Sequence, residues 1–186
     1  DACTTANDAI YALQQAHAHL PWYREEDPNA PNELTACFMP RFYADDAALR
    51  IYSAGEHMAK FLLDYFNISD AEFKEFAEIK KIKRKPRLEK IACLLQEKFS
   101  DSSITKPISN LVHEVSWTET VQYRNDWVHN QPWLIEGMGI VYERKTRWKD
   151  SPKKHILIGE GDKPRYTIEK LLEIFTDSLE SLVLVL

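Results

Sequence analysis

Apolar residues recur at three- and four-residue steps through most of this chain of 186 residues, and this spacing is what most constrains its fold. An α-helix brings such residues to one face, whereas a half-buried strand needs strict alternation. The chain has only 5 glycines, and its many Ala, Leu, Glu and Lys residues favour helix. Hydrophobic residues make up 44% of the sequence, which is enough for a core. The sequence therefore predicts a single all-α domain over residues 1–186.

Prolines and polar turns divide the helical pattern into about five to six helices, which we expect to form an up-and-down bundle. The expected helices cover residues 1–20, 34–66, 70–79, 87–99, 107–129 and 168–182. Pro21 should end the first helix, and Pro40 is a candidate break in the second. Ser69 and Thr167 are suitable N-caps. The expected inward stripe of the second helix is Phe42, Leu49, Tyr52, Ala59, Leu63 and Phe66.

The pattern changes after Pro132. Residues 138–142 and 155–158 are β-rich, and a polar, basic stretch separates them. Two such runs around a polar tip predict a small β-hairpin within residues 133–160, inserted before the C-terminal helix.

Charge and cysteine content limit the classes of protein to consider. The net charge of −5 argues against a protein coated in nucleic acid, although it leaves room for a local basic patch. The three cysteines are far apart and form no CxxC pair, so neither a disulfide framework nor a zinc knuckle is indicated. No apolar run approaches the roughly 18 residues of a membrane-spanning helix. We therefore expect a cytoplasmic protein that does not enter the membrane.

Residues 80–87 form a basic run, Lys-Lys-Ile-Lys-Arg-Lys-Pro-Arg. Such a run is usually a solvated linker between helices, and the alternative is a surface that contacts nucleic-acid phosphates. The candidate nucleic-acid-binding residues are Lys81, Lys83, Arg84 and Lys85.

A second cluster, Arg124, Asn125 and His129, lies near the end of the helix expected over residues 107–129. Side chains four residues apart share a helix face, so Asn125 and His129 should point together. Asn125 and His129 are the last two members of a stripe along one face of this helix, which consists of Ile104, Ile108, Leu111, Val115, Thr118, Gln122, Asn125 and His129. Its early members are apolar and its late members polar, which indicates that the helix ends at a wet cleft or an interface.

These residue types fit metal-independent cleavage of an RNA phosphodiester. Arginine can hold a phosphate oxygen and histidine can transfer a proton near neutral pH, while asparagine can orient either partner. Glu56 lies on the inward stripe of its helix, where it either pairs with Arg124 or His129 or is partly solvated, and Asp126 is a second supporting acid. Phosphate-cradling loops and HExxH or ExxH metal motifs are absent from the sequence, so no cofactor or metal is expected.

The segment Arg124-Asn125-x-x-x-His129 resembles the Arg-polar-x-x-x-His motif of the HEPN superfamily, whose members are small helical bundles and in many cases RNases. Residues 47–63 also resemble an early helix of that fold. The resemblance implies that Arg124 and His129 are the catalytic pair, with Asn125 as the polar residue beside the arginine. It further implies a symmetric homodimer with facing motif helices, a defence or toxin–antitoxin system, and an antitoxin or other protein partner.

This sequence departs from the family in two ways: the minimal bundle lacks the hairpin, and Asn130 and Gln131 stand where some toxin members carry a tyrosine. Two alternatives to an RNase follow. The chain could be a catalytically inactive HEPN-like module that binds RNA, a nucleotide or a partner protein. Alternatively, Arg124 and His129 are structural and tied to acids such as Glu56 and Asp126.

Overall fold

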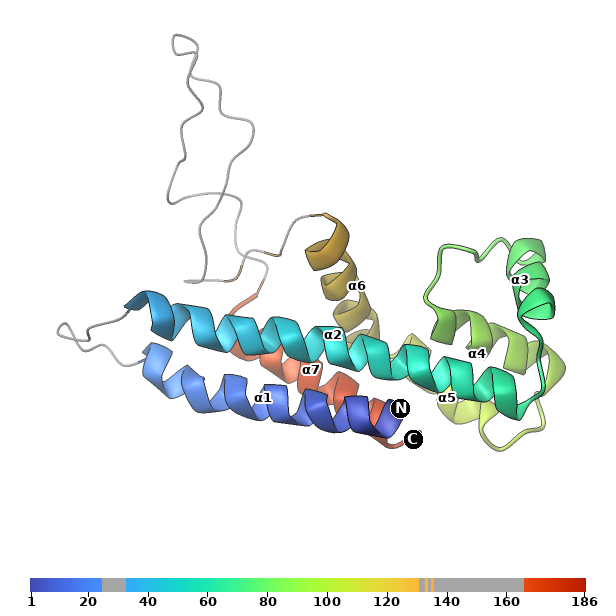
Figure 1. The fold of residues 1–186 in the computed structure, drawn as a ribbon, viewed down its shortest axis with the longest axis horizontal. Coiled ribbons are helices and arrows are strands. Elements are labelled where there is room, and N and C mark those ends of the chain that lie inside the picture. The colour runs from blue at the N-terminus through green and yellow to red at the C-terminus, as the bar shows by residue number, and fades with distance from the viewer. Residues whose placement is uncertain (25–32, 131–132, 134, 136–165) are drawn as a thin grey trace, which may run out of the picture.

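The computed structural model describes residues 1–24, 33–130, 133, 135 and 166–186, and these contain seven α-helices (Figure 1). Apart from Trp133 and Ile135, the hairpin expected within residues 133–160 lies outside the described residues. In the described ranges, the prediction of an all-α fold is confirmed, with more helices than expected. None of these helices is both long and apolar enough to cross a membrane.

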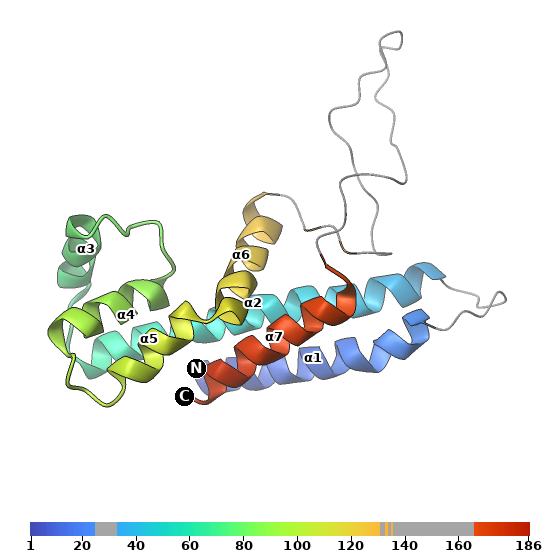
Figure 2. The same ribbon diagram turned by 180° about the vertical axis from the view of Figure 1, so that it is seen from behind.

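The helices follow one another as α1 (Ala2–Arg24), α2 (Glu33–Tyr65), α3 (Asp70–Ile79), α4 (Arg87–Lys98), α5 (Thr105–His113), α6 (Val115–His129) and α7 (Ile168–Val183). Helices α1, α2 and α7 pack along one another, and the two chain ends lie close together (Figures 1 and 2). Helix α2 extends beyond this group and carries α4, which packs on α5. Helix α6 contacts α2 and α7 and rises away from the layer that they form.

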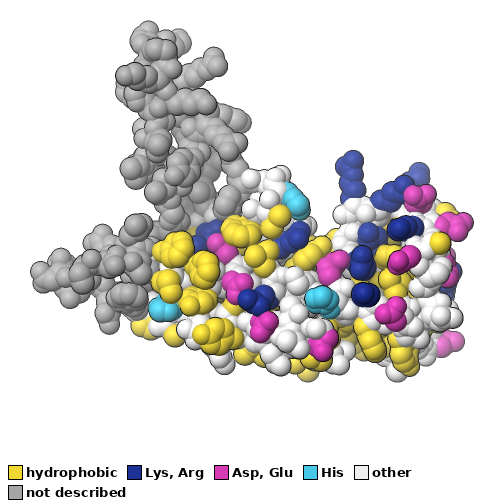
Figure 3. Space-filling view, in the orientation of Figure 1, with side chains coloured by type: hydrophobic (Ala, Val, Ile, Leu, Met, Phe, Trp, Pro, Cys, Tyr) yellow, Lys and Arg dark blue, Asp and Glu magenta, His cyan; other side chains and the backbone are white. Residues whose placement is uncertain are grey.

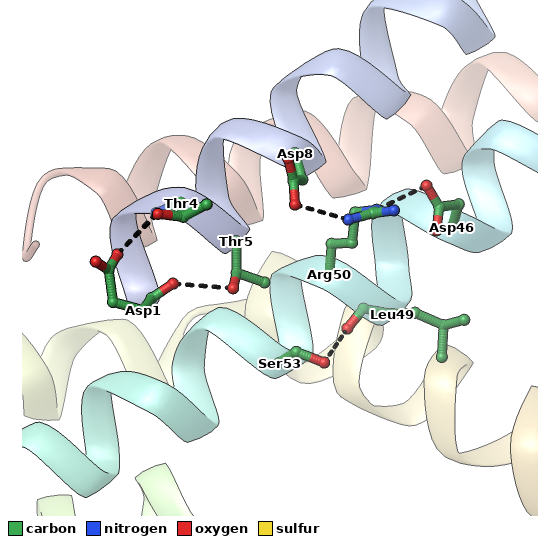
Figure 4. A network of polar contacts seen from close by, with 8 residues as sticks. All are labelled: Asp1, Thr4, Thr5, Asp8, Asp46, Leu49, Arg50 and Ser53. Atoms are coloured by element: carbon green, nitrogen blue, oxygen red, sulfur yellow. Dashed lines mark hydrogen bonds and ion pairs between the residues drawn. The ribbon is translucent and has the colours of Figure 1, made fainter.

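Alanines form much of the contact between α1 and α2. The buried alanines of the described parts of these helices are Ala6, Ala9, Ala12 and Ala16 of α1, and Ala44, Ala47, Ala48, Ala54 and Ala59 of α2. Small side chains let two helices approach closely. At the edge of this contact, Arg50 of α2 lies 2.9 Å from the Asp8 carboxylate of α1 and 2.7 Å from that of Asp46 (Figure 4). The α1–α2 pair therefore has an apolar centre and a charged margin.

Neither proline in the long helices acts as predicted. Helix α1 continues through Pro21 to Arg24, and α2 runs through Pro40 without a break. A proline removes one backbone hydrogen bond from a helix, and the extensive packing of α1 on α2 offsets that loss.

The buried stripe of α2 also differs from the prediction. Phe42 is 50% exposed, whereas Ile51, Met58 and Leu62 are buried. Leu63 and Ala59 are buried as expected. The expected stripe follows the large side chains, but the neighbouring helices cover the alanine-rich face of α2 instead.

The helix expected over residues 107–129 is two helices. Glu114 has extended backbone angles, φ −66° and ψ 141°, and it ends α5 and precedes α6. Val115 is consequently 73% exposed, and Trp117 is buried in its place. A Cβ atom added to Gly55 of α2 would lie only 2.4 Å from the Trp117 ring, so the glycine allows α6 to approach α2. The predicted continuous stripe does not exist, because each helix buries its own face.

Three other predictions at helix ends are confirmed. The Ser69 hydroxyl accepts a hydrogen bond from the Glu72 backbone N–H at 3.2 Å, and the Thr167 hydroxyl accepts one from Lys170 in the same way. Helix α4 starts after Pro86. The residues at apolar helical spacing in α4 and α7 are buried, namely Leu88, Ile91, Ala92, Leu95, Ile168, Leu171, Leu172, Phe175, Leu179 and Leu182.

Candidate functional site

The basic run and the Arg124 cluster line opposite walls of one cleft. One hollow of about 470 Å³ is lined by Arg124, Asn125 and His129 of α6 and by residues 84–87. It adjoins a second hollow of about 360 Å³, because both are lined by residues 84–86 and Asn125. Figure 3 shows Lys and Arg side chains gathered over α4 and the α3–α4 connection, across a notch from α6. We call the two hollows together the basic cleft.

The larger hollow is the polar end of the basic cleft. Its cationic lining residues are Arg84, Lys85, Arg87, Lys90 and Arg124, and its carboxylate is Glu56. Within the described residues, no carboxylate forms an ion pair with Arg84, Arg87 or Arg124. The polar end therefore carries a local excess of positive charge although the whole chain is acidic, and such a surface attracts anions.

Arg124 is held in a defined orientation. Its guanidinium carbon lies 4.1 Å from the centre of the Tyr52 ring of α2, a cation–π geometry. Its Nη1 donates a 2.9 Å hydrogen bond to Oδ1 of Asn125. Burial, and then the nearby Glu56 carboxylate, raise the pKa of Tyr52, which keeps the ring neutral at ordinary pH. The Arg124 Nε is buried and has no hydrogen-bond partner in the described part of the protein.

His129 lies at the last position of α6 and is exposed. Its side chain lines the polar end together with Arg124 and Asn125. The structure thus brings the three predicted residues to one cleft wall, and leaves the imidazole accessible to a ligand.

Glu56 also lines the polar end, but it does not form the predicted pair with Arg124 or His129. Its carboxylate accepts a 2.8 Å hydrogen bond from the backbone N–H of Arg87, at the start of α4. A carboxylate at a helix N-terminus is stabilised by the helix dipole. Glu56 is half-buried, in agreement with the partly solvated alternative, and it ties α4 to α2 beside the cleft.

Asp126 forms its hydrogen bonds with residues other than Arg124 and His129. One of its carboxylate oxygens accepts a 2.7 Å hydrogen bond from the Trp133 indole N–H, and the other accepts one at 2.9 Å from the Asn130 amide. The residue therefore fixes the chain where it leaves α6. Neither of these bonds reaches Arg124 or His129, so the supporting role predicted for Asp126 stays a prediction.

The residues of the basic run divide between the cleft and the surface. Arg84 and Lys85 line both hollows, and Lys81 lines the smaller one. Lys83 lines neither hollow and pairs with Glu78 at 2.6 Å. Lys85 lies 3.2 Å from the Glu89 carboxylate. Three of the four predicted residues thus face the cleft.

A specific turn directs the run toward α6. Lys81 has a left-handed φ of 58° just after α3. Its N–H donates to Glu78 O at 3.1 Å, and the Ile82 N–H donates to Ala77 O at 3.0 Å. These two bonds form a Schellman motif. Ile82 consequently packs against the core, and the cations on either side of it project outward.

Three residues of the polar end are absent from the site predicted from the sequence, namely Tyr52, Arg87 and Lys90. The apolar spacing of α2 predicts Tyr52 as a core residue, and Arg87 is the last residue of the basic run. The spacing of Arg87 and Lys90, three residues apart on one helix face, was the available signal for the last two.

A buried polar cluster lies on the other side of α6. The Tyr123 hydroxyl donates a short hydrogen bond to Asp45 of α2, and Arg41 Nε donates to the same carboxylate oxygen at 2.9 Å. Arg41 also bonds the Trp133 carbonyl at 3.2 Å. Burial raises the pKa of Asp45 despite the opposing effect of Arg41, and burial and the Asp45 charge raise the pKa of Tyr123. This cluster attaches α6 to α2.

The basic cleft can bind a phosphate group and transfer a proton beside it. Arg124 supplies a fixed cation, Arg87 and Lys90 supply further positive charge, and His129 supplies an accessible imidazole. Among the described side chains, no group of three or more His, Cys, Asp or Glu residues is placed to hold a metal ion.

No protein-family model matches the chain, and no curated protein or solved structure shows significant similarity to it. The residues and geometry of the basic cleft are therefore the basis on which a function can be inferred.

Proposed function

We propose that the protein is a metal-independent endoribonuclease of the HEPN type, with Arg124 and His129 as its catalytic pair. The observation that carries this proposal is that both residues line one cleft with a cationic wall from a distant part of the sequence. An RNA backbone would lie along this wall, because phosphates are attracted to an excess of Lys and Arg.

The reaction follows from the chemistry of the two side chains. His129 takes the proton from a ribose 2′-hydroxyl, and the 2′-oxygen attacks the adjacent phosphorus. Arg124 stabilises the negative charge of the phosphorane. The bond from phosphorus to the 5′-oxygen then breaks, and that oxygen takes up a proton from water. The products are a 2′,3′-cyclic phosphate and a 5′-hydroxyl end.

The proposal includes a symmetric homodimer in which two motif helices face each other. The end of α6 supports it, because Val128 is 42% exposed and His129 and Asn130 are exposed beside it. Light scattering after size-exclusion chromatography should give twice the mass of the 21.7 kDa chain. A monomer that cleaves RNA would refute the dimer while leaving the reaction intact. We further propose that the activity serves a defence or toxin–antitoxin system in the cytoplasm, with an antitoxin as regulating partner.

The decisive experiment is cleavage of a labelled single-stranded RNA in EDTA. His129→Ala should reduce the rate at least ~100-fold, the usual contribution of a general base. His57→Ala is the matched control, since His57 is exposed on α2 and does not line the cleft. RNA methylated at every 2′-oxygen should resist cleavage.

Undiminished cleavage by the His129→Ala variant would exclude the proposed mechanism. If the wild type binds RNA in the cleft without cleaving it, the chain is instead the binding-only HEPN-like module.

A further inference from the structure

The smaller hollow of the basic cleft differs in chemistry from the larger one. Its surface is mostly apolar, and its apolar lining residues are Ile82, Pro86 and Val121. Ile82 is held against the core by the Schellman motif that ends α3, and Val121 is buried in α6. This apolar end therefore has fixed walls, and it lies open beside a cationic polar end.

We infer that the apolar end binds the base of a nucleotide whose phosphate lies at the polar end. The inference takes its ligand class from the proposed function and adds a base-binding subsite to it. A nucleotide joins a flat, largely apolar base to an anionic phosphate through one ribose. The basic cleft repeats this order, because its two ends meet at Pro86 and Asn125, which line both.

The sizes and the polar groups agree with this occupant. Volumes of about 360 and 470 Å³ fall within the usual range for small-ligand sites, about 300–1,000 Å³. Gln122 lines the apolar end and is exposed. Its side-chain amide has no hydrogen-bond partner among the described residues. An amide offers both a donor and an acceptor, so Gln122 can bond the edge of a base that lies against Ile82 and Val121.

The first test compares ligands by calorimetry at low salt. Adenosine 5′-monophosphate and ribose 5-phosphate carry the same phosphate and sugar, and only the former carries a base. We expect the nucleotide to bind about tenfold more tightly, the gain typical of one well-packed base. Equal affinities would overturn the inference.

The second test fills the apolar end. Thr118 is exposed on α6 and lines this end, so Thr118→Phe should occupy the space of the base without disturbing the core. The Thr118→Phe variant should bind ribose 5-phosphate as tightly as the wild type does. Its affinity for adenosine 5′-monophosphate should fall to the same level as its affinity for ribose 5-phosphate. Val115→Phe, a change at another exposed position of the same helix that does not line the cleft, should alter neither affinity. Tight nucleotide binding by Thr118→Phe would place the base elsewhere.

These results are separate from the test of the RNase. A mononucleotide has no internucleotide bond to cleave, so its affinity does not depend on the activity of His129. Cleavage of RNA without a base-dependent affinity would refute the base subsite alone. Base-dependent affinity without cleavage would refute the RNase alone.

Discussion

Tyr123 and Arg124 are neighbours in the sequence, and they lie on two sides of α6 with opposite electrostatic character. On the Tyr123 side, the Asp45 carboxylate is met by Arg41 and by the Tyr123 hydroxyl. On the Arg124 side, the cations of the basic cleft outnumber its carboxylates, and Arg124 itself contacts a neutral ring and an amide.

The difference shows how one helix can serve both the fold and a ligand. Charges that are neutralised within the protein stabilise the packing of α6 on α2. Cations that are held in place by neutral groups keep their attraction for an external anion. Variants on the two sides of α6 should therefore separate stability from binding.

The largest effect is expected on the Tyr123 side. Asp45→Ala removes the acceptor shared by Tyr123 and Arg41 and leaves the buried Tyr123 hydroxyl and the Arg41 Nε without that partner, which should lower the free energy of unfolding by about 3 kcal/mol. Urea unfolding followed by circular dichroism measures this loss. Asp46→Ala is the control, because the neighbouring Asp46 forms a more exposed pair with Arg50 and should cost at most about 1 kcal/mol. Equal losses would show that the buried Asp45 cluster contributes no more to the free energy of unfolding than the exposed pair of Asp46 and Arg50 does.

The next effect is on the Arg124 side. Tyr52→Leu removes the ring beneath the guanidinium, a contact of roughly 1.4 kcal/mol, and RNA affinity and cleavage should fall about tenfold. Tyr52→Phe keeps the ring and should retain most of both. A loss as large for Phe as for Leu would assign the effect to the hydroxyl instead. Neither variant should lower the free energy of unfolding as much as Asp45→Ala does.

The pH dependence of the free energy of unfolding tests the direction of the Asp45 pKa shift on the Tyr123 side. Because burial raises the pKa of Asp45 above its ordinary value of 3.8, the folded chain binds this proton more tightly than the unfolded chain. The carboxyl group therefore contributes most to stability below that value, and its contribution is lost as the pH rises through the folded pKa. We expect the unfolding free energy of the wild type, relative to Asp45→Asn, to decrease above about pH 4, by at most ~1.4 kcal/mol per pH unit. A relative stability that increases with pH would contradict the assigned direction.

The smallest effect concerns the turn that directs the basic run. Lys81 and Asn67 both have left-handed backbones after a helix, with φ of 58° and 51°. Asparagine tolerates this conformation better than lysine does. Lys81→Gly should therefore raise the free energy of unfolding by about 0.5 kcal/mol, whereas Asn67→Gly should change it little. If Lys81→Gly and Asn67→Gly raise the free energy of unfolding equally, the left-handed backbone of Lys81 is no more strained than that of Asn67.

Much of the helical structure could be predicted locally. Ser69, Thr167 and Pro86 mark helix starts, and the apolar spacing of α4 and α7 identifies their buried faces. These signals suffice because each depends on residues within one or two turns. The break at Glu114 was missed, since the apolar spacing continues across it and only the packing of Trp117 against Gly55 shows that α6 turns away.

The candidate site shows the same division. Local spacing is enough to place Arg124, Asn125 and His129 at one helix end and to identify residues 80–87 as a basic connection. The packing of the helices is needed to show that these segments face each other, that the Tyr52 ring lies against the Arg124 guanidinium, and that Asp126 bonds Trp133. Spacing along a helix fixes which side chains lie together on it, but which segments meet across a cleft depends on how the helices pack.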